Sequence, residues 1–137
     1  NTHLDVQDPN QATAASQVGE LLAWIQQVGG SDISVIAGDL NSTNPADYPP
    51  EEALFLAQLD ARRGYRHQDT VIRTIKQAGY ESTRTPASHS VFGSGTCWSR
   101  HSPDHIFVSP NGWQFRDRRS SRIYTYKSDH AAVICDF

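Results

Sequence analysis

Apolar residues in the first part of the chain recur at two different spacings. Between the turn signals at 8–10 and Gly29, the spacing matches one face of a helix, which predicts an amphipathic helix. Its core-facing residues are Val18, Leu21, Leu22 and Ile25. The run 33–37 is short, continuous and apolar, and it predicts a buried strand that ends at Gly38-Asp39-Leu40-Asn41. Ligand-binding side chains commonly lie at such strand ends in open α/β sheets.

Other segments add a partial strand, a loop and two helices. Residues 1–6 read as the end of a strand whose preceding apolar run is missing. Residues 42–50 are rich in Ser, Asn and Pro and predict an irregular loop, and 51–60 predict a helix. A further short helix is predicted from a capping Asp69 to Gly79.

The last part of the chain predicts a loop and then strands. Residues 81–95 predict a long loop, because Gly, Pro, Ser and Thr are frequent there. Strands are expected near 96–98, 105–109, 122–126 and 131–137, with turns at 110–112 and 127–128. The element order therefore predicts an α/β fold in one partial domain spanning 1–137, with a mixed sheet and helices on one face.

The composition is that of a globular domain. Of 137 residues, 37% are hydrophobic and 20% are charged, which suits one domain with a modest core. No stretch approaches the roughly 20 apolar residues of a membrane-spanning helix, and the formal charge of -3 argues against a generally basic nucleic-acid-binding protein. Cys97 and Cys135 lack metal-ligand spacing, so they form one disulfide bond or remain buried thiols. The chain has no Met, from which we expect a processed or partial chain.

Five polar residues at predicted strand ends could provide chemistry. Asp39 and Asn41 are two apart, so a carboxylate and an amide could meet one phosphate or metal ion; the alternative is an Asx turn that closes the strand. If the strand beginning at Asp104 neighbours the last strand, Asp104 could accept a hydrogen bond from His130 and orient its ring. His3 could donate to a phosphate oxygen. Each residue taken alone also fits a structural role.

Four motifs together resemble the endonuclease/exonuclease/phosphatase family, whose type member is deoxyribonuclease I. They are Asn1-Thr2-His3-Leu4-Asp5, Gly38-Asp39-Leu40-Asn41, Pro103-Asp104-His105-Ile106-Phe107-Val108-Ser109 and Ser128-Asp129-His130-Ala131-Ala132-Val133. They occur in the order and approximate spacing of that family and cover essentially the whole chain. The resemblance implies the C-terminal half of a two-sheet α/β sandwich that hydrolyses phosphate esters with activated water.

The resemblance also implies roles for individual residues. Asp39 would position or activate the water or assist the leaving group, and Asn41 would hold the phosphate. His130 would act as an acid/base that contacts the phosphate and is oriented by Asp104. His3 would contact the phosphate as well.

The metal site implied by the resemblance is incomplete in this chain. Mg²⁺, or Mn²⁺ as an alternative, would be bound with the help of Asp129, Asp39 and Asn41. The principal glutamate ligand and the partner sheet belong to an N-terminal half that no segment here resembles. We therefore expect that half to be supplied in cis or by a second chain, and the present chain to be inactive alone. A one-sheet half would also expose its inner apolar face.

Two rival interpretations remain open. One is a non-catalytic binding module of the same fold. The other is a transition-metal hydrolase site built from His3, Asp5, Asp39, His105, Asp129 and His130. Against the second rival, His105 should point away from Asp104 if both lie in one regular strand. The candidate substrates are phosphate esters of nucleic acid, phospholipid, inositol or nucleotide-linked type.

Some charged and aromatic residues fit either a binding or a surface role. The basic and aromatic residues that could bind a polyanion are Trp113, Phe115, Arg116, Arg118, Arg119 and Arg122. The alternative for them is the solvated face of a hairpin. His67, His89 and His101 have no partner spacing, and we interpret them as surface residues.

Overall fold

The computed structural model describes residues 1–5, 11–29, 33–64, 69–83, 101, 103–111, 120–123, 128–130 and 132–135. The helices are α1 (Ala12–Gly29), α2 (Pro50–Arg62) and α3 (Thr70–Gln77), with a 3-10 turn η1 (Pro45–Asp47). The strands are β1 (Thr2–His3), β2 (Val35–Asp39), β3 (Glu81–Ser82), β4 (Asp104–Val108), β5 (Ser120–Ile123) and β6 (Ala132–Cys135). No helix within these ranges is long and apolar enough to cross a membrane.

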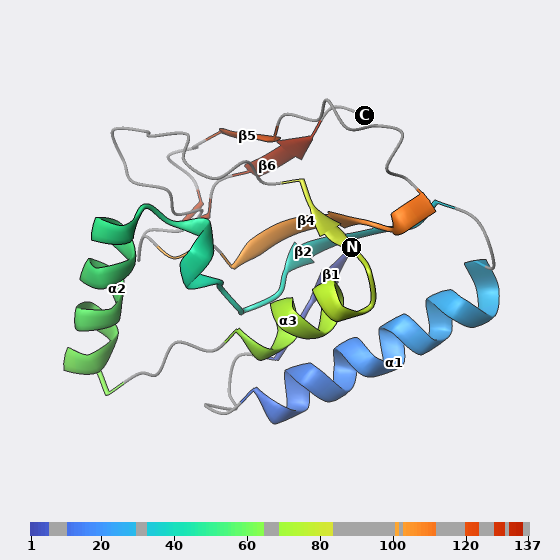
Figure 1. Ribbon diagram of the computed structural model, residues 1–137, viewed down its shortest axis with the longest axis horizontal. Helices are drawn as coiled ribbons and strands as arrows, with labels where there is room; N and C mark the ends of the chain where they lie inside the picture. Colours follow the sequence, from blue (N-terminus) through green and yellow to red (C-terminus); the bar gives the residue numbers. More distant parts are fainter. Residues whose placement is uncertain are drawn as a thin grey trace.

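The central sheet has four strands in the order β1-β2-β4-β3. β1 is parallel to β2, whereas β4 is antiparallel to both β2 and β3, so the sheet is mixed as predicted. β5 and β6 form a separate antiparallel pair. In Figure 1, α1 and α3 lie together on one side of β2 and β4, and β5 and β6 lie on the other. The predicted α/β class is confirmed at this level.

The hydrophobic core lies between the central sheet and the helices α1 and α3. It contains Leu4, Ala14, Val18, Ile36, Leu40, Val71, Ile72, Ile75, Tyr80 and Phe107. Successive side chains of β2 alternate between two faces: Ile36 is 3% exposed, whereas Val35 is 46% exposed. The helices therefore bury the face of β2 that carries Ile36. The opposite face, which carries Val35 and Asp39, is not covered by them.

Several local expectations differ from the structure. Among the described residues, the side chain of Asp69 makes no capping hydrogen bond to α3. Its carboxylate instead lies 3.6 Å from the guanidinium of Arg73, one turn later. The loop over 42–50 contains η1, which Asn44 caps by accepting the N–H of Ala46. The loop expected from residue 81 begins instead with β3, because Glu81 and Ser82 pair with the edge of β4.

The pairing of the last strands also differs from the expectation for Asp104. Within the described ranges, β4 is hydrogen-bonded to β2 and β3, and β6 is hydrogen-bonded to β5. Contact between Asp104 and His130 therefore does not require their strands to be sheet neighbours. Cys135 is half-buried and forms no disulfide bond with a described residue. The expected strand near 96–98, the basic and aromatic side chains of 113–122, and Cys97, His67 and His89 lie outside what is described.

Candidate functional site

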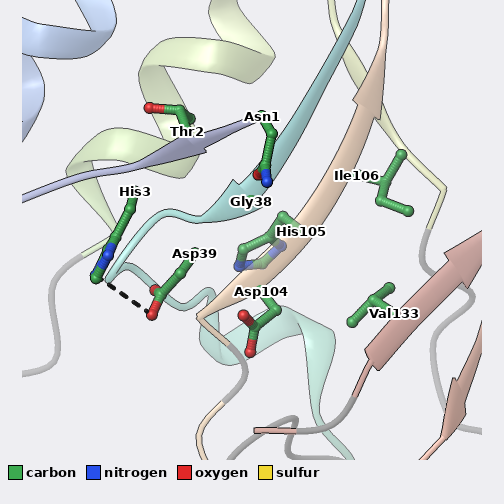
Figure 2. Close-up of a pocket in the computed structure, with 9 residues that line it drawn as sticks. All are labelled: Asn1, Thr2, His3, Gly38, Asp39, Asp104, His105, Ile106 and Val133. Carbon is green, nitrogen blue, oxygen red and sulfur yellow. Dashed lines mark ion pairs between the residues drawn. The ribbon is translucent and has the colours of Figure 1, made fainter.

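Three polar side chains form a row across the ends of three strands. Asp39 is the register partner of His3 in β1 and of Asp104 in β4. Because register partners point to the same face of a sheet, these side chains are neighbours. Figure 2 shows them at one end of the strands, where Nε2 of His3 lies 3.7 Å from Oδ2 of Asp39.

A glycine allows β1 to approach β2 closely at this row. Gly38 has a φ of 148°, and a Cβ placed on it would collide with the carbonyl oxygen of Thr2. Only a residue without a Cβ accepts both this backbone conformation and this contact. The Gly38-Asp39 dipeptide therefore brings His3 alongside Asp39.

The turn after β2 is held by Asp39 and Asn41. Oδ1 of Asp39 accepts the backbone N–H of Asn41 at 2.9 Å, which is an Asx turn. The side-chain amide of Asn41 donates to the carbonyl oxygen of Leu4 at 2.7 Å, just after β1. Asn41 itself has a φ of 46°, a conformation that Asn tolerates better than most residues. Asn41 therefore links the turn after β2 to the end of β1.

His130 is hydrogen-bonded to Asp104. Its Nδ1 lies 2.9 Å from Oδ2 of Asp104 and 3.9 Å from Oδ2 of Asp39. An ionised carboxylate can only accept, so Nδ1 carries the hydrogen and donates it. In the neutral ring, Nε2 is then the atom that can take up a proton.

The surroundings of His130 act on its pKa in opposite directions. Partial burial lowers the pKa, but the hydrogen bond to Asp104 and the negative charges of Asp104, Asp39 and Asp129 outweigh it. The pKa therefore lies above the ordinary value of 6.5. Asp129 is exposed and contributes through its charge. The site thus favours an imidazolium next to two carboxylates.

The donor groups of this site suit a divalent cation. One ligand atom each from Asp39, Asp104 and His130 lies within 4.8 Å of the others. Mg²⁺ is usually held by one or two carboxylates and several waters. Asp39 and Asp104 can supply the carboxylates. An imidazole is a ligand that transition metals take more readily. Of the expected metal-binding residues, Asp39 belongs to this group and Asp129 lies outside it. The amide nitrogen of Asn41 donates to Leu4, which leaves its side-chain oxygen as an acceptor.

A cavity of about 580 Å³ adjoins the row and is lined by residues of β1, β2, β4 and β6. His3, Asp39 and Asp104 supply polar groups to its wall, and Ile106 and Val133 supply apolar ones (Figure 2). The cavity therefore offers both polar and apolar surface beside the carboxylates.

His105 takes no part in the group of ligand atoms. It is 3% exposed, and its Nε2 lies 2.9 Å from the carbonyl oxygen of Ser42. Its ring stacks on Phe107 at 5.6 Å, on the core side of β4. The residues of the transition-metal rival are therefore not brought together, since neither His105 nor Asp5 belongs to the group among the described residues.

The interpretation of His101 as a surface residue was wrong. Its side chain is 16% exposed, and Nε2 lies 3.0 Å from Oδ1 of Asp60 in α2. The sequence contained one indication that a polar partner was needed here. Asp60 follows Leu56 by one turn on the apolar face of the predicted helix. A carboxylate in that position requires a polar partner.

The described site therefore consists of a row of three side chains, an imidazole bonded to one of them, and a cavity beside the row. No family model matches the chain, and neither does any curated protein or solved structure. What the site does is accordingly inferred from its own residues and their geometry.

Proposed function

We propose that this chain carries part of the active site of a metal-dependent phosphoesterase. It would be the C-terminal half of a deoxyribonuclease I-like sandwich of the endonuclease/exonuclease/phosphatase family. The observation that supports this most is the His3, Asp39 and Asp104 row with His130 bonded to Asp104. Separate sequence motifs contribute these groups, and paired carboxylates next to an oriented imidazole suit hydrolysis by activated water.

The chain's own residues would move protons and orient the reactants. The water oxygen attacks phosphorus, the bond to the ester oxygen breaks, and one proton passes from the water towards the leaving oxygen. Nε2 of His130 is the atom that can exchange a proton, since Nδ1 is held by Asp104. Asp39 is placed to orient the water or to accept its proton, and His3 to donate to a phosphate oxygen.

A divalent cation would be held by the carboxylates of Asp39 and Asp104, with the charge of Asp129 nearby. We propose Mg²⁺, with Mn²⁺ as the alternative. When bound, the ion would polarise a phosphoryl oxygen and stabilise the negative charge of the transition state. It would also offset the repulsion between the two carboxylates.

A second sheet would complete the site. Val35 is 46% exposed and lies on the same face of β2 as Asp39, because the two residues are four positions apart in a strand. In the proposal, the partner sheet packs on this face and covers Val35. That half, in cis or in a second chain, would supply a further metal ligand and the loops that select the substrate.

Hydrolysis of bis-p-nitrophenyl phosphate tests the proposal. The natural full-length protein and this chain alone are assayed with and without Mg²⁺. We expect turnover only in the full-length protein with Mg²⁺. Asp39→Asn should abolish it, whereas Asp69→Asn is the matched control, because the side chain of Asp69 is 43% exposed, lies just before α3 and pairs with Arg73.

Each other outcome has a distinct meaning. If neither protein hydrolyses this ester or natural nucleic-acid, phospholipid and inositol phosphate esters, the binding-module interpretation replaces the proposal. Turnover by this chain alone would mean that its own residues are sufficient for catalysis without a second half. Turnover without any divalent cation would exclude the metal-dependent mechanism.

A further inference from the structure

A part-buried pair outside the row links α2 to the segment that precedes β4. Nε2 of His101 faces both carboxylate oxygens of Asp60, at 3.0 Å and 3.2 Å. The side chains are 16% and 6% exposed. Asp60 lies one turn after Leu56 on the buried side of α2. Residues 41 positions apart are thus joined away from solvent.

This pair is more than a surface contact. A buried carboxylate is strongly disfavoured unless a donor or a positive charge compensates it. One imidazole nitrogen placed between its two oxygens contributes to that compensation. Moving His101 away would remove this contribution from a carboxylate that is 6% exposed, so the pair resists displacement of the chain at residue 101.

The segment anchored in this way leads directly into the site. Asp104, the first residue of β4, is three residues after His101. Between them, Pro103 is buried, and its carbonyl oxygen accepts the N–H of Leu40 at 2.8 Å. Leu40 follows Asp39 directly. The entry to β4 is therefore held by α2 at one point and by the end of β2 at another.

We propose that the Asp60 and His101 pair positions Asp104, so that its carboxylate meets His130 and lies opposite Asp39. A hydrogen bond of 2.9 Å weakens steeply with small displacements. The bond of Pro103 to Leu40 and the register of Asp104 with Asp39 hold the entry of β4 on the side of β2, and the Asp60 and His101 pair holds it on the side of α2. Asp60 and His101 act as positioning residues, because among the described residues neither belongs to the row or lines the cavity.

Proton NMR of this chain tests the inference without any assay of turnover. The Nδ1–H of His130, bonded to a carboxylate, gives a downfield resonance that His130→Ala assigns by removing it. We expect Asp60→Ala to lose or strongly broaden this resonance. Leu56→Ala is the matched control: it weakens the packing of the same face of α2 one turn away and should keep the resonance.

A second variant covers the case in which Asp60→Ala fails to fold. Asp60→Asn retains a side-chain oxygen that can accept from Nε2 of His101, so it should fold and keep more of the His130 resonance than Asp60→Ala or His101→Ala. An unchanged resonance in a folded Asp60→Ala or His101→Ala protein would overturn the inference. So would equal loss in Leu56→Ala, because any disturbance of α2 would then suffice.

The catalytic consequence rests on the proposed function. In the full-length protein, Asp60→Asn should reduce kcat several-fold and leave KM nearly unchanged, since the substrate does not contact Asp60. Absence of turnover in the wild-type protein would defeat the proposed function but leave the NMR result standing. An altered KM with unchanged kcat would contradict a positioning role.

Discussion

Asp39 and Asp104 are directly opposite each other on neighbouring antiparallel strands. Their side chains are only 19% and 17% exposed, so solvent screens them poorly. Like charges directly opposite destabilise a sheet by a few tenths to about 1 kcal/mol. Nδ1 of His130 reaches both carboxylates, at 2.9 Å and 3.9 Å, and offsets this cost when the ring is protonated. An arrangement that lowers stability is what a binding or catalytic site commonly requires.

The first prediction concerns this repulsion. Above the pKa of His130 and without a divalent cation, Asp39→Asn should raise the free energy of unfolding by up to about 1 kcal/mol. The substituted amide keeps an oxygen that can accept the N–H of Asn41. Adding Mg²⁺ should then stabilise the wild-type chain but not the variant. Urea unfolding with and without Mg²⁺ measures both effects.

Asp69→Asn is the control for this experiment, because it also removes one negative charge, but just before α3, where the side chain is 43% exposed. It should show neither the gain in stability nor the loss of the Mg²⁺ effect. Equal responses of the two variants would mean that overall charge, and not the opposition of Asp39 and Asp104, sets the result.

The second prediction concerns the pH dependence of His130. Asp104→Asn should lower the pKa of His130, because burial then opposes a weaker set of negative charges. A pKa raised in the folded state stabilises the protein below the unfolded value of about 6.5, and this stabilisation is lost as the pH rises through the folded pKa. The variant should therefore be more destabilised, relative to wild type, at about pH 5.5 than well above the folded pKa.

An NMR titration of the His130 ring, together with denaturant unfolding at the two pH values, tests this prediction. A His130 pKa that does not change in Asp104→Asn would show that the hydrogen bond contributes little. A loss of stability that is the same at both pH values would point to lost packing instead.

The third prediction concerns the close approach of β1 and β2. Gly38→Ala should lower the free energy of unfolding by about 3 kcal/mol. The added Cβ collides with the carbonyl oxygen of Thr2, and the φ of 148° at this position is strained for alanine. Gly64→Ala is the matched comparison. Its φ is 71°, but an added Cβ meets nothing within 4 Å, so only the backbone strain of about 1 kcal/mol remains. Similar losses in chemical denaturation would contradict the close approach.

The fourth prediction separates the two functions of Asn41. Asn41→Ala loses the hydrogen bond to Leu4 and is strained at a φ of 46°, which together should cost about 2 kcal/mol. Asn41→Gly also loses the hydrogen bond but is not strained, so it should lower the free energy of unfolding by about 1 kcal/mol. This figure includes the greater entropy of glycine in the unfolded chain. Chemical denaturation of both variants measures the difference. If Gly is no better than Ala, the backbone conformation matters little there.

The fifth prediction rests on the proposed function. In the full-length protein, His130→Ala should reduce turnover of a phosphodiester by about 100-fold or more, as expected for loss of a positioned acid/base. Circular dichroism should show that folding is retained, because His130 is partly exposed and precedes β6. Near-normal turnover would remove His130 from the catalytic groups.

Local patterns were enough to place α1 and α2, because the spacing of apolar residues depends only on the geometry of each element. The buried strand predicted over 33–37 is instead β2 (Val35–Asp39), in which Ile36 is the one buried residue and Val35 is 46% exposed. Local patterns were also enough to nominate His3, Asp39, Asp104 and His130. Local patterns were less reliable where one side chain has two possible local partners. Asp69 is of a residue type that caps helices, yet its carboxylate lies near Arg73 and makes no capping hydrogen bond.

By itself, the sequence determined the α/β class, the position of the main helices and the types of residue available to the site. The tertiary structure decided which of these residues meet. The row of His3, Asp39 and Asp104 depends on the register of strands that are far apart along the chain. The burial of His101 likewise depends on Asp60, 41 residues away. Strand register and long-range burial arise from packing between distant segments, which no local periodicity encodes.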